Sequence, residues 1–273
     1  GEIAAGEAIF EGDDLLSMDL GDLREIRGGK VGFIFQDPMT SLNPVVTVGD
    51  QIMESLTVHQ PARRREMRAR ALELLQLVGI PSPEDRLRCY PHELSGGMRQ
   101  RVMIAIALAC NPTVLVADEP TTALDVTIQA QILELVKDLR AKLGMAVIWI
   151  THDLGVVAGL VDRVLVMYGG QIVEDAPVDE FYAAPRHPYS QGLLASLPSA
   201  TSRGEKLVNI KGQPPDMRQP PASCSFAPRC PHAFDRCHQE NPVLTAVSAT
   251  RKVSCWLDEV PTIPDTEGAG HGV

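Results

Sequence analysis

The sequence lacks a long apolar run, a signal peptide and an excess of basic residues. Its longest apolar run is Val102 to Cys110, whereas a membrane-spanning helix needs about 18 such residues. The N-terminus is acidic and rich in glycine, without the basic start and apolar stretch of a signal peptide. We therefore expect no segment that crosses a membrane by itself, and a cytoplasmic location.

The charge balance excludes a further class of partner. The 35 Asp and Glu residues outnumber the 25 Lys and Arg residues, which gives a formal charge of -10. An acidic protein repels phosphate unless its basic residues gather on one face, so no nucleic-acid partner is expected. The arginines of residues 63–70 are better explained as a solvated helix face than as a nucleic-acid patch. With 44% hydrophobic and 22% charged residues, the 273-residue chain has the composition of a soluble globular protein.

Strand-like and helix-like patterns alternate through the first 175 residues. The apolar runs that predict buried strands are 31–35, 114–117 and 145–150. The stretches with helical periodicity are 48–56, 63–78, 98–109 and 128–143. This alternation argues for an α/β fold, with a parallel sheet covered by helices. Short antiparallel strands are expected within 2–16, and a hairpin at the sheet edge from 164–167 and 171–173.

The composition changes past about residue 175. Proline becomes frequent, at Pro185, Pro188 and Pro198 and in two Gln-Pro-Pro sequences, so little helix is expected there. Residues 261–273 lack apolar periodicity and are expected to be disordered. The predicted regions are therefore 1–175, 176–260 and 261–273.

Two consecutive carboxylates, Asp118 and Glu119, follow the apolar run 114–117. Carboxylates removed from water need a charged partner, which a metal ion with a phosphate-bearing ligand would supply. In phosphoryl transfer the first acid can hold Mg²⁺, and the second can orient or deprotonate the attacking water. Taken alone, the pattern is weak evidence for catalysis.

Three further sites have a chemical and a plain structural interpretation. Ser95, Gly96 and Gly97 precede a helix, where free backbone N–H groups bind anions, but they also suit a simple N-cap. His152 follows an apolar run and is otherwise explained as a turn residue, with Asp153 capping the next helix. Gln36 is otherwise explained as the end of a strand.

Five short motifs occur in a fixed order along the chain. They are FIFQDP with Gln36, LSGGMRQ at 94–100, VLVADEP at 114–120, TALD at 122–125 and THD at 151–153. This arrangement resembles the nucleotide-binding subunit of ATP-binding cassette (ABC) transporters, with its Q-loop, signature sequence, Walker B, D-loop and switch histidine. The resemblance implies an ABC-type P-loop NTPase core, with a parallel sheet flanked by helices, antiparallel edge strands and a helical signature subdomain at about 45–105.

The resemblance also implies roles for the matched residues, with ATP and Mg²⁺ as cofactors. Gln36 and Asp118 would contact Mg²⁺, Glu119 would act as general base, and His152 would contact the γ-phosphate. Gln36 would also contact the attacking water and sense the membrane partner.

The remaining matched residues would serve an ATP molecule held by an opposing subunit, because this family sandwiches two ATP molecules between two head-to-tail domains. They are the signature residues Ser95, Gly96, Gly97 and Gln100. Asp125 of the D-loop would link the two sites.

One motif of this family is missing. A Walker A loop, Gly-x4-Gly-Lys-Ser/Thr, should lie upstream of the Q-loop and cradle the phosphates. Gly1 and Gly6 have the glycine spacing, but Glu7 and Ala8 occupy the places of the lysine and the hydroxyl residue. A truncated piece of a longer protein and a degenerate subunit both explain this, and truncation is favoured because the downstream positions are intact. We expect the isolated chain to bind ATP poorly and to be inactive.

Two longer stretches narrow the resemblance. FIFQDPMTSLNP at 33–44 and RHPY at 186–189, followed by LLASLP, resemble the oligopeptide and dipeptide permease ATPases. The match extends to about Leu257. It implies peptide uptake driven at the cytoplasmic face of the bacterial inner membrane, with two integral membrane permeases and an extracytoplasmic substrate-binding protein. HDLGVVA at 152–158 is closer to the D-type ATPase, so an F-type subunit is expected to complete a heterodimer.

Other functions stay open on the sequence. Nickel chelates and glutathione travel through systems with similar ATPases. A non-transport ABC ATPase of DNA repair or translation is a second alternative, and a regulatory module whose metal-binding tail is the active part is a third.

The tail holds four of the six cysteines, Cys224, Cys230, Cys237 and Cys255. They are separated by five, six and seventeen residues, unlike the paired C-x2-C units of a zinc ribbon. Disulfides are not expected in a cytosolic protein. Because the resembling permease tails carry cysteines in this arrangement, a [4Fe–4S] cluster is favoured, with zinc and free thiols as alternatives.

Overall fold

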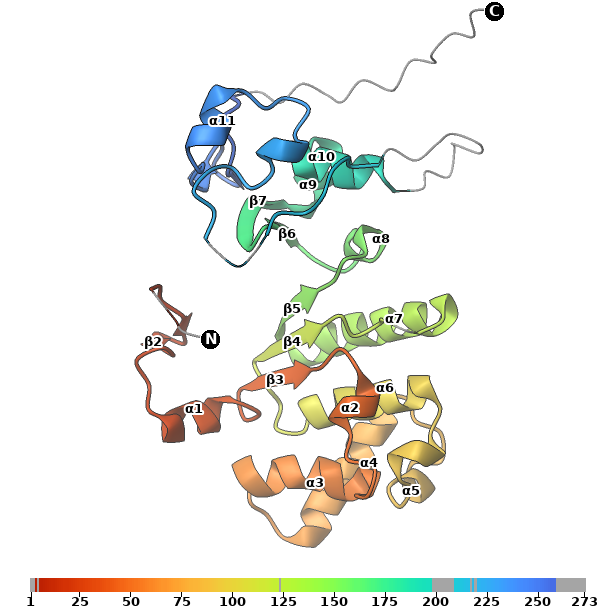
Figure 1. The fold of residues 1–273 in the computed structure, drawn as a ribbon. Helices are drawn as coiled ribbons and strands as arrows, with labels where there is room; N and C mark the ends of the chain where they lie inside the picture. The colour runs from red at the N-terminus through yellow and green to blue at the C-terminus, as the bar shows by residue number, and fades with distance from the viewer. Residues whose placement is uncertain are drawn as a thin grey trace, which may run out of the picture. The chain divides into compact units, whose positions relative to one another are not determined.

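A computed structural model describes Ile3 and residues 5–122, 124–197, 209–216, 218 and 220–258. The chain divides into two compact units, Gly1–His152 and Asp153–Val273, which are described separately (Figure 1). The predicted region boundaries at 175 and 260 stay predictions, and the predicted disorder of 261–273 lies outside the described residues.

A parallel sheet in the order β3-β4-β5 forms the centre of the first unit. Its strands are β3 (Val31–Ile34), β4 (Val114–Asp118) and β5 (Ala146–Ile150). In the register, Phe33 pairs with Val116, which pairs with Ile148 on the other side. The predicted α/β fold with a parallel sheet is confirmed. Because the three strands are parallel, their carboxyl ends lie at the same edge of the sheet.

One helix precedes these strands, and helices fill most of the chain between them. They are α1 (Leu20–Ile26), α2 (Pro38–Ser41), α3 (Val48–His59), α4 (Arg64–Leu77), α5 (Pro83–Arg86), α6 (Gly96–Ala107) and α7 (Val126–Leu143), with a 3₁₀ turn at Pro91–Glu93. Thr47, Ser95 and Asp125 cap α3, α6 and α7, and each side chain accepts a backbone N–H of the first turn. The predicted antiparallel strands near the N-terminus are β1 (Ile9–Phe10) and β2 (Asp13–Asp14).

One apolar core joins α3, α4 and α6 to the sheet. Ile52, Leu74, Leu75, Ile104 and Leu115 are among its fully buried side chains. The backbone of α6 lies directly against β3, because residue 32 is glycine and a Cβ there would collide with the carbonyl oxygen of Ala107.

The sheet is buried on one face more than on the other. Ile34, Leu115 and Ala117 are fully buried, whereas Phe33, Ile148 and Ile150 are 40%, 54% and 47% exposed. The prediction of buried strands was wrong for this second face. Successive side chains point to opposite faces of a strand, and an apolar run does not say whether anything covers both.

The second unit is built on an antiparallel sheet in the order β6-β7-β9-β8. Its strands are β6 (Arg163–Tyr168), β7 (Gln171–Pro177), β8 (Thr245–Ala246) and β9 (Lys252–Val253). The predicted hairpin is the pair β6-β7, turned by two glycines with φ of 57° and 75°. Its predicted place at the edge of the parallel sheet was wrong, because these strands pair within a separate antiparallel sheet. The sheet packs on an apolar core that includes Tyr168, Phe181 and Phe226.

The tail contains more helix than its prolines predicted. The helices of this unit are α8 (Leu154–Val157), α9 (Val178–Ala183), α10 (Pro188–Ala195) and α11 (Asp235–Gln239), with a 3₁₀ turn at Ala227–Arg229. Pro188 is the first residue of α10, where its missing N–H costs no helical hydrogen bond. The expectation of little helix was wrong because proline breaks a helix only in its interior.

A buried acid ties β7 to the segment that leads into α10. Glu174 is fully buried and accepts the backbone N–H groups of Arg186 and His187, each at 2.9 Å. Arg251, just before β9, places Nη1 3.7 Å from Glu174 Oε1 and also donates to the carbonyl oxygen of Ala184. One carboxylate therefore joins three separate parts of this unit.

None of the helices among the described residues is both long enough and apolar enough to cross a membrane.

Candidate active site

Side chains from all three parallel strands meet at the carboxyl edge of the sheet. Gln36 follows β3, Glu119 follows β4 directly, and His152 follows β5. Gln36 Nε2 donates to Glu119 Oε2 at 2.9 Å, and His152 Nδ1 lies 3.1 Å from Glu119 Oε1. The structure thus brings three of the predicted site residues together around one carboxylate, at the edge where open α/β sheets bind ligands.

The backbone at Glu119 makes a sharp turn. Its φ of 44° is left-handed, which is uncommon for a residue other than glycine. The N–H of Glu119 donates to the carbonyl oxygen of Ile150 at 2.9 Å, which ties the turn to β5. Strained backbone of this kind concentrates at functional sites.

Sequence reasoning missed a further partner of this carboxylate. Thr122 Oγ1 donates to Glu119 Oε2 at 2.9 Å. The sequence places Thr122 only as the first residue of the TALD motif. Its spacing of three residues from Glu119, in a turn after a strand, is the signal that could have found it.

These donors favour the ionised form of Glu119. Hydrogen bonds from His152 and then Thr122 hold the pKa of the Glu119 carboxyl below its ordinary value. The side chain is 25% exposed and that of His152 is 72% exposed, so water reaches the cluster. A charged carboxylate in contact with water is what a general base requires.

Asp118 is the last residue of β4 and directly precedes Glu119 in the sequence. Its side chain is half-buried. Together with Gln36 it supplies oxygen atoms at the ends of two adjacent strands. Mg²⁺ binds through one or two carboxylates together with phosphates and water, so this pair fits the ion. Within the described residues, no group of three or more His, Cys, Asp or Glu side chains forms a metal site by itself.

The signature residues lie on a different element, at the start of α6. Ser95 is the N-cap and accepts the N–H of Met98 at 3.4 Å, as the structural interpretation predicted. Ser95 and Gly96 are exposed, which also leaves this helix end open to an anion. Gln100 is only 1% exposed, so in this structure it does not face a second subunit. Asp125 accepts the N–H of Ile128 at 2.9 Å at the start of α7.

The four tail cysteines line one small cavity in the second unit. Cys224, Cys230, Cys237 and Cys255 surround about 10 Å³, together with His187, His232 and Trp256. All four are free thiols. Burial raises the pKa of Cys224, of Cys255 and of Cys230, the last to about 11. Within the described residues, which include these four cysteines, no group of three or more His, Cys, Asp or Glu side chains is arranged to hold a metal ion, so the structure gives the expected [4Fe–4S] cluster no support.

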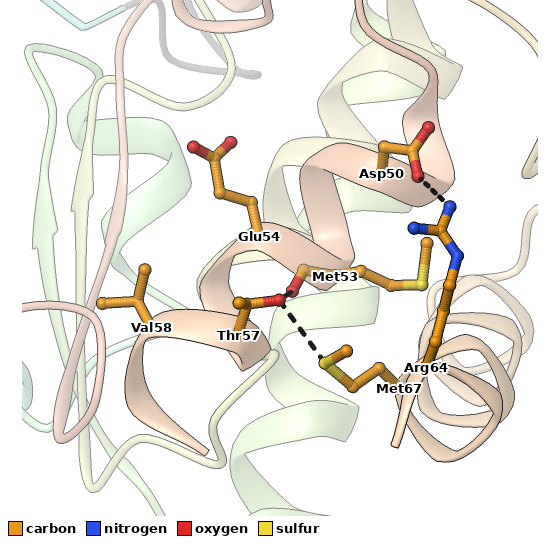
Figure 2. Close-up of a pocket in the computed structure, with 7 residues that line it drawn as sticks. All are labelled: Asp50, Met53, Glu54, Thr57, Val58, Arg64 and Met67. Atoms are coloured by element: carbon orange, nitrogen blue, oxygen red, sulfur yellow. Dashed lines mark hydrogen bonds and ion pairs between the residues drawn. The ribbon is translucent and has the colours of Figure 1, made fainter. Parts of the chain in front are cut away.

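A larger pocket of about 420 Å³ lies on α3 and α4 and contains none of the predicted site residues (Figure 2). Met53, Val58 and Met67 supply its apolar lining. Charged side chains stand at its margin, where Arg64 Nη2 donates to Asp50 Oδ1 at 3.1 Å. The hydroxyl group of Thr57 on α3 donates a hydrogen bond to the carbonyl oxygen of Met53 at 2.8 Å. Its oxygen lies 3.5 Å from the sulfur of Met67 on α4.

A parallel sheet with a carboxylate, an amide and an imidazole at its carboxyl edge is the arrangement of a nucleotide-hydrolysing α/β protein. Comparison with known proteins narrows this class. Residues 2–122 match the ABC transporter family, and residues 173–237 match the family described as "Oligopeptide/dipeptide transporter, C-terminal region".

Similar proteins agree with this assignment. The chain is 55% identical to the oligopeptide transport ATP-binding protein OppD of Bacillus subtilis, over 94% of this chain and 72% of the relative. It is 49% identical to the dipeptide transport ATP-binding protein DppD of the same organism, over 94% and 77%. A dimeric structure of the ATP-binding cassette MJ0796 with ADP and phosphate matches with a TM-score of 0.57 and 32% identity, over 64% of this chain and 74% of that one. The chain therefore belongs to the ABC transporter ATPases of the oligopeptide/dipeptide type.

Proposed function

We propose that this chain supplies the catalytic base of an ABC ATPase that drives the import of peptides across the cytoplasmic membrane, working from the cytoplasmic face. The names of the oligopeptide and dipeptide transport relatives support the substrate class. The observation that carries the proposal is the Glu119 carboxylate, bonded to Gln36 and His152 at the ends of three parallel strands.

In this proposal Glu119 takes the proton of the attacking water. Its lowered pKa keeps it ionised near neutral pH, so the base is ready without a prior deprotonation. Gln36 orients the water, and His152 contacts the γ-phosphate. Mg²⁺, held by Asp118 and Gln36, would neutralise charge on the phosphate oxygens.

A second subunit is part of the proposal. Ser95, Gly96 and Gly97 offer the exposed N-terminus of α6 to an ATP molecule held by the opposing subunit, which we propose is an F-type ATPase. Asp125 links the two sites from the start of α7. Gln100 would join the signature contact only if the start of α6 rearranges, because its side chain is buried.

The pocket on α3 and α4 suits a membrane permease as partner (Figure 2). Its methionines adapt to the shape of an apolar side chain, and the Asp50–Arg64 pair at its margin offers both signs of charge. We propose that a helix of one of two integral permeases docks here, and that an extracytoplasmic binding protein delivers the substrate to them.

Exchange of the base tests the proposed activity. Glu119→Gln, in the subunit assembled with its permeases, should abolish ATP hydrolysis and uptake of a labelled peptide. Glu134→Gln makes the same chemical change on the exposed surface of α7 and should leave both rates unchanged. Full ATPase activity in Glu119→Gln would refute the role of this carboxylate. Competition by nickel chelates or glutathione, but not by peptides, would assign the transporter to one of those substrates instead.

A metal centre in the tail is a separate proposal. We propose that the four cysteines hold a [4Fe–4S] cluster, with a single zinc ion as the alternative. Four cysteines line one cavity, although the described residues hold no group arranged to bind a metal. About 10 Å³ has room for one water-sized atom, so a cluster requires the sulfurs to move apart. Anaerobic purification followed by iron, sulfide and zinc analysis decides between them. Cys230→Ser should lose the metal while Cys89→Ser keeps it, and neither iron nor zinc in the wild type would exclude both.

A further inference from the structure

Thr122 differs from the other two partners of Glu119 in how it is attached. Gln36 and His152 reach the carboxylate from the ends of β3 and β5. Thr122 belongs to the same turn as Glu119, and its N–H donates to the carbonyl oxygen of Glu119 at 3.1 Å. Two hydrogen bonds therefore join these residues, one from the backbone N–H of Thr122 and one from its hydroxyl group. They fix the position of Thr122 relative to Glu119.

The three donors also divide between the two carboxylate oxygens. Thr122 Oγ1 and Gln36 Nε2 both donate to Oε2, each at 2.9 Å. His152 Nδ1 contacts Oε1, at 3.1 Å. When His152 turns to a phosphate and Gln36 to water or Mg²⁺, as the proposed function requires, Thr122 is the donor that remains on Oε2.

We propose that Thr122 is a positioning residue, which anchors Oε2 of Glu119 so that Oε1 is the oxygen that receives the proton of the attacking water. This inference rests on the proposed function of Glu119. A carboxylate fixed at one oxygen keeps a single orientation toward its reactant, and holding a base in place lowers the barrier without altering substrate binding.

Removal of the hydroxyl group tests this role in the subunit assembled with its permeases. Thr122→Val and Thr122→Ala should each lower kcat for ATP hydrolysis about tenfold, the effect of one hydrogen bond to a charged group, with KM for ATP within about twofold. Thr122→Ser keeps the hydroxyl and should restore kcat.

The controls separate this inference from the proposed function. Thr127→Val removes an exposed hydroxyl on the first turn of α7 and should leave kcat unchanged. If Glu119→Gln abolishes hydrolysis while Thr122→Val and Thr122→Ala match the wild type, the positioning role is wrong and the base stands. Equal losses of kcat in Thr122→Ser and Thr122→Val would show that the hydroxyl group does not position Glu119. Normal activity of Glu119→Gln would refute both proposals.

Discussion

The buried carboxylate of Glu174 gives a quantitative test of what holds the second unit together. Glu174→Gln keeps the shape of the side chain and removes its charge. The amide oxygen can accept only one of the two backbone N–H groups that now donate at 2.9 Å, and its NH₂ group faces the other. Arg251, whose side chain is 7% exposed, loses the buried one of its two carboxylate neighbours, at 3.7 Å.

Both losses occur away from water, so they are not compensated by solvent. Breaking a buried ion pair by removing one partner costs about 3 to 5 kcal/mol, and we expect Glu174→Gln to lower the free energy of unfolding of this unit by that amount. Glu180→Gln is the matched control. Its side chain is 43% exposed and lies 3.6 Å from Arg251 Nε, so its loss should cost less than about 1 kcal/mol.

The two tryptophans permit the measurement. Trp149 lies in the first unit and Trp256 in the second, so Trp149→Phe leaves a single fluorophore in the unit of interest. Urea unfolding of each variant in this background, followed by Trp256 fluorescence, gives the free energy by linear extrapolation. A loss below about 1 kcal/mol for Glu174→Gln, or equal losses at positions 174 and 180, would refute the reasoning.

Two further predictions concern packing and pH. Gly32→Ala should lower the free energy of unfolding of the first unit by about 1 to 3 kcal/mol, because the new Cβ meets the backbone oxygen of Ala107. Urea unfolding followed by Trp149 fluorescence in a Trp256→Phe background measures this loss, and an unchanged unfolding midpoint would contradict it. Burial lowers the pKa of His187 to about 4, so between pH 6.5 and 5 the unfolded chain binds more protons than the folded one. The free energy of unfolding of the second unit should therefore fall by about 2 kcal/mol over this range. His187→Asn keeps an acceptor for the N–H of Tyr189 and should flatten this pH dependence, and an equally steep loss in that variant would assign it to other groups.

The sheet and its active edge could be predicted from the sequence for a simple geometric reason. Each strand is an apolar run that ends in polar residues, and the helices between them force the strands to run parallel. Gln36, Glu119 and His152 follow three such runs, so their meeting at one edge needs no knowledge of packing.

The features that could not be predicted depend on contacts across the chain or on the exact position in an element. Gln100 is one turn into α6 and faces the core, although its motif suggests a surface role. Pro188 begins a helix because it stands at the first position, and a proline count cannot show this. The hydroxyl of Thr122 finds Glu119 only once the turn between them has formed.

The absence of a side chain at Gly32 has a mechanical consequence. β3 ends just before Gln36, and α6 begins just after Ser95. At Gly32 the backbone of β3 packs directly against the backbone of α6 at Ala107, without a side chain of residue 32 between them that could change rotamer when the strand moves. A displacement of β3 would therefore act directly on the C-terminal end of α6, and in the proposed dimer β3 leads to the loop that serves one nucleotide while α6 begins at the loop that serves the other.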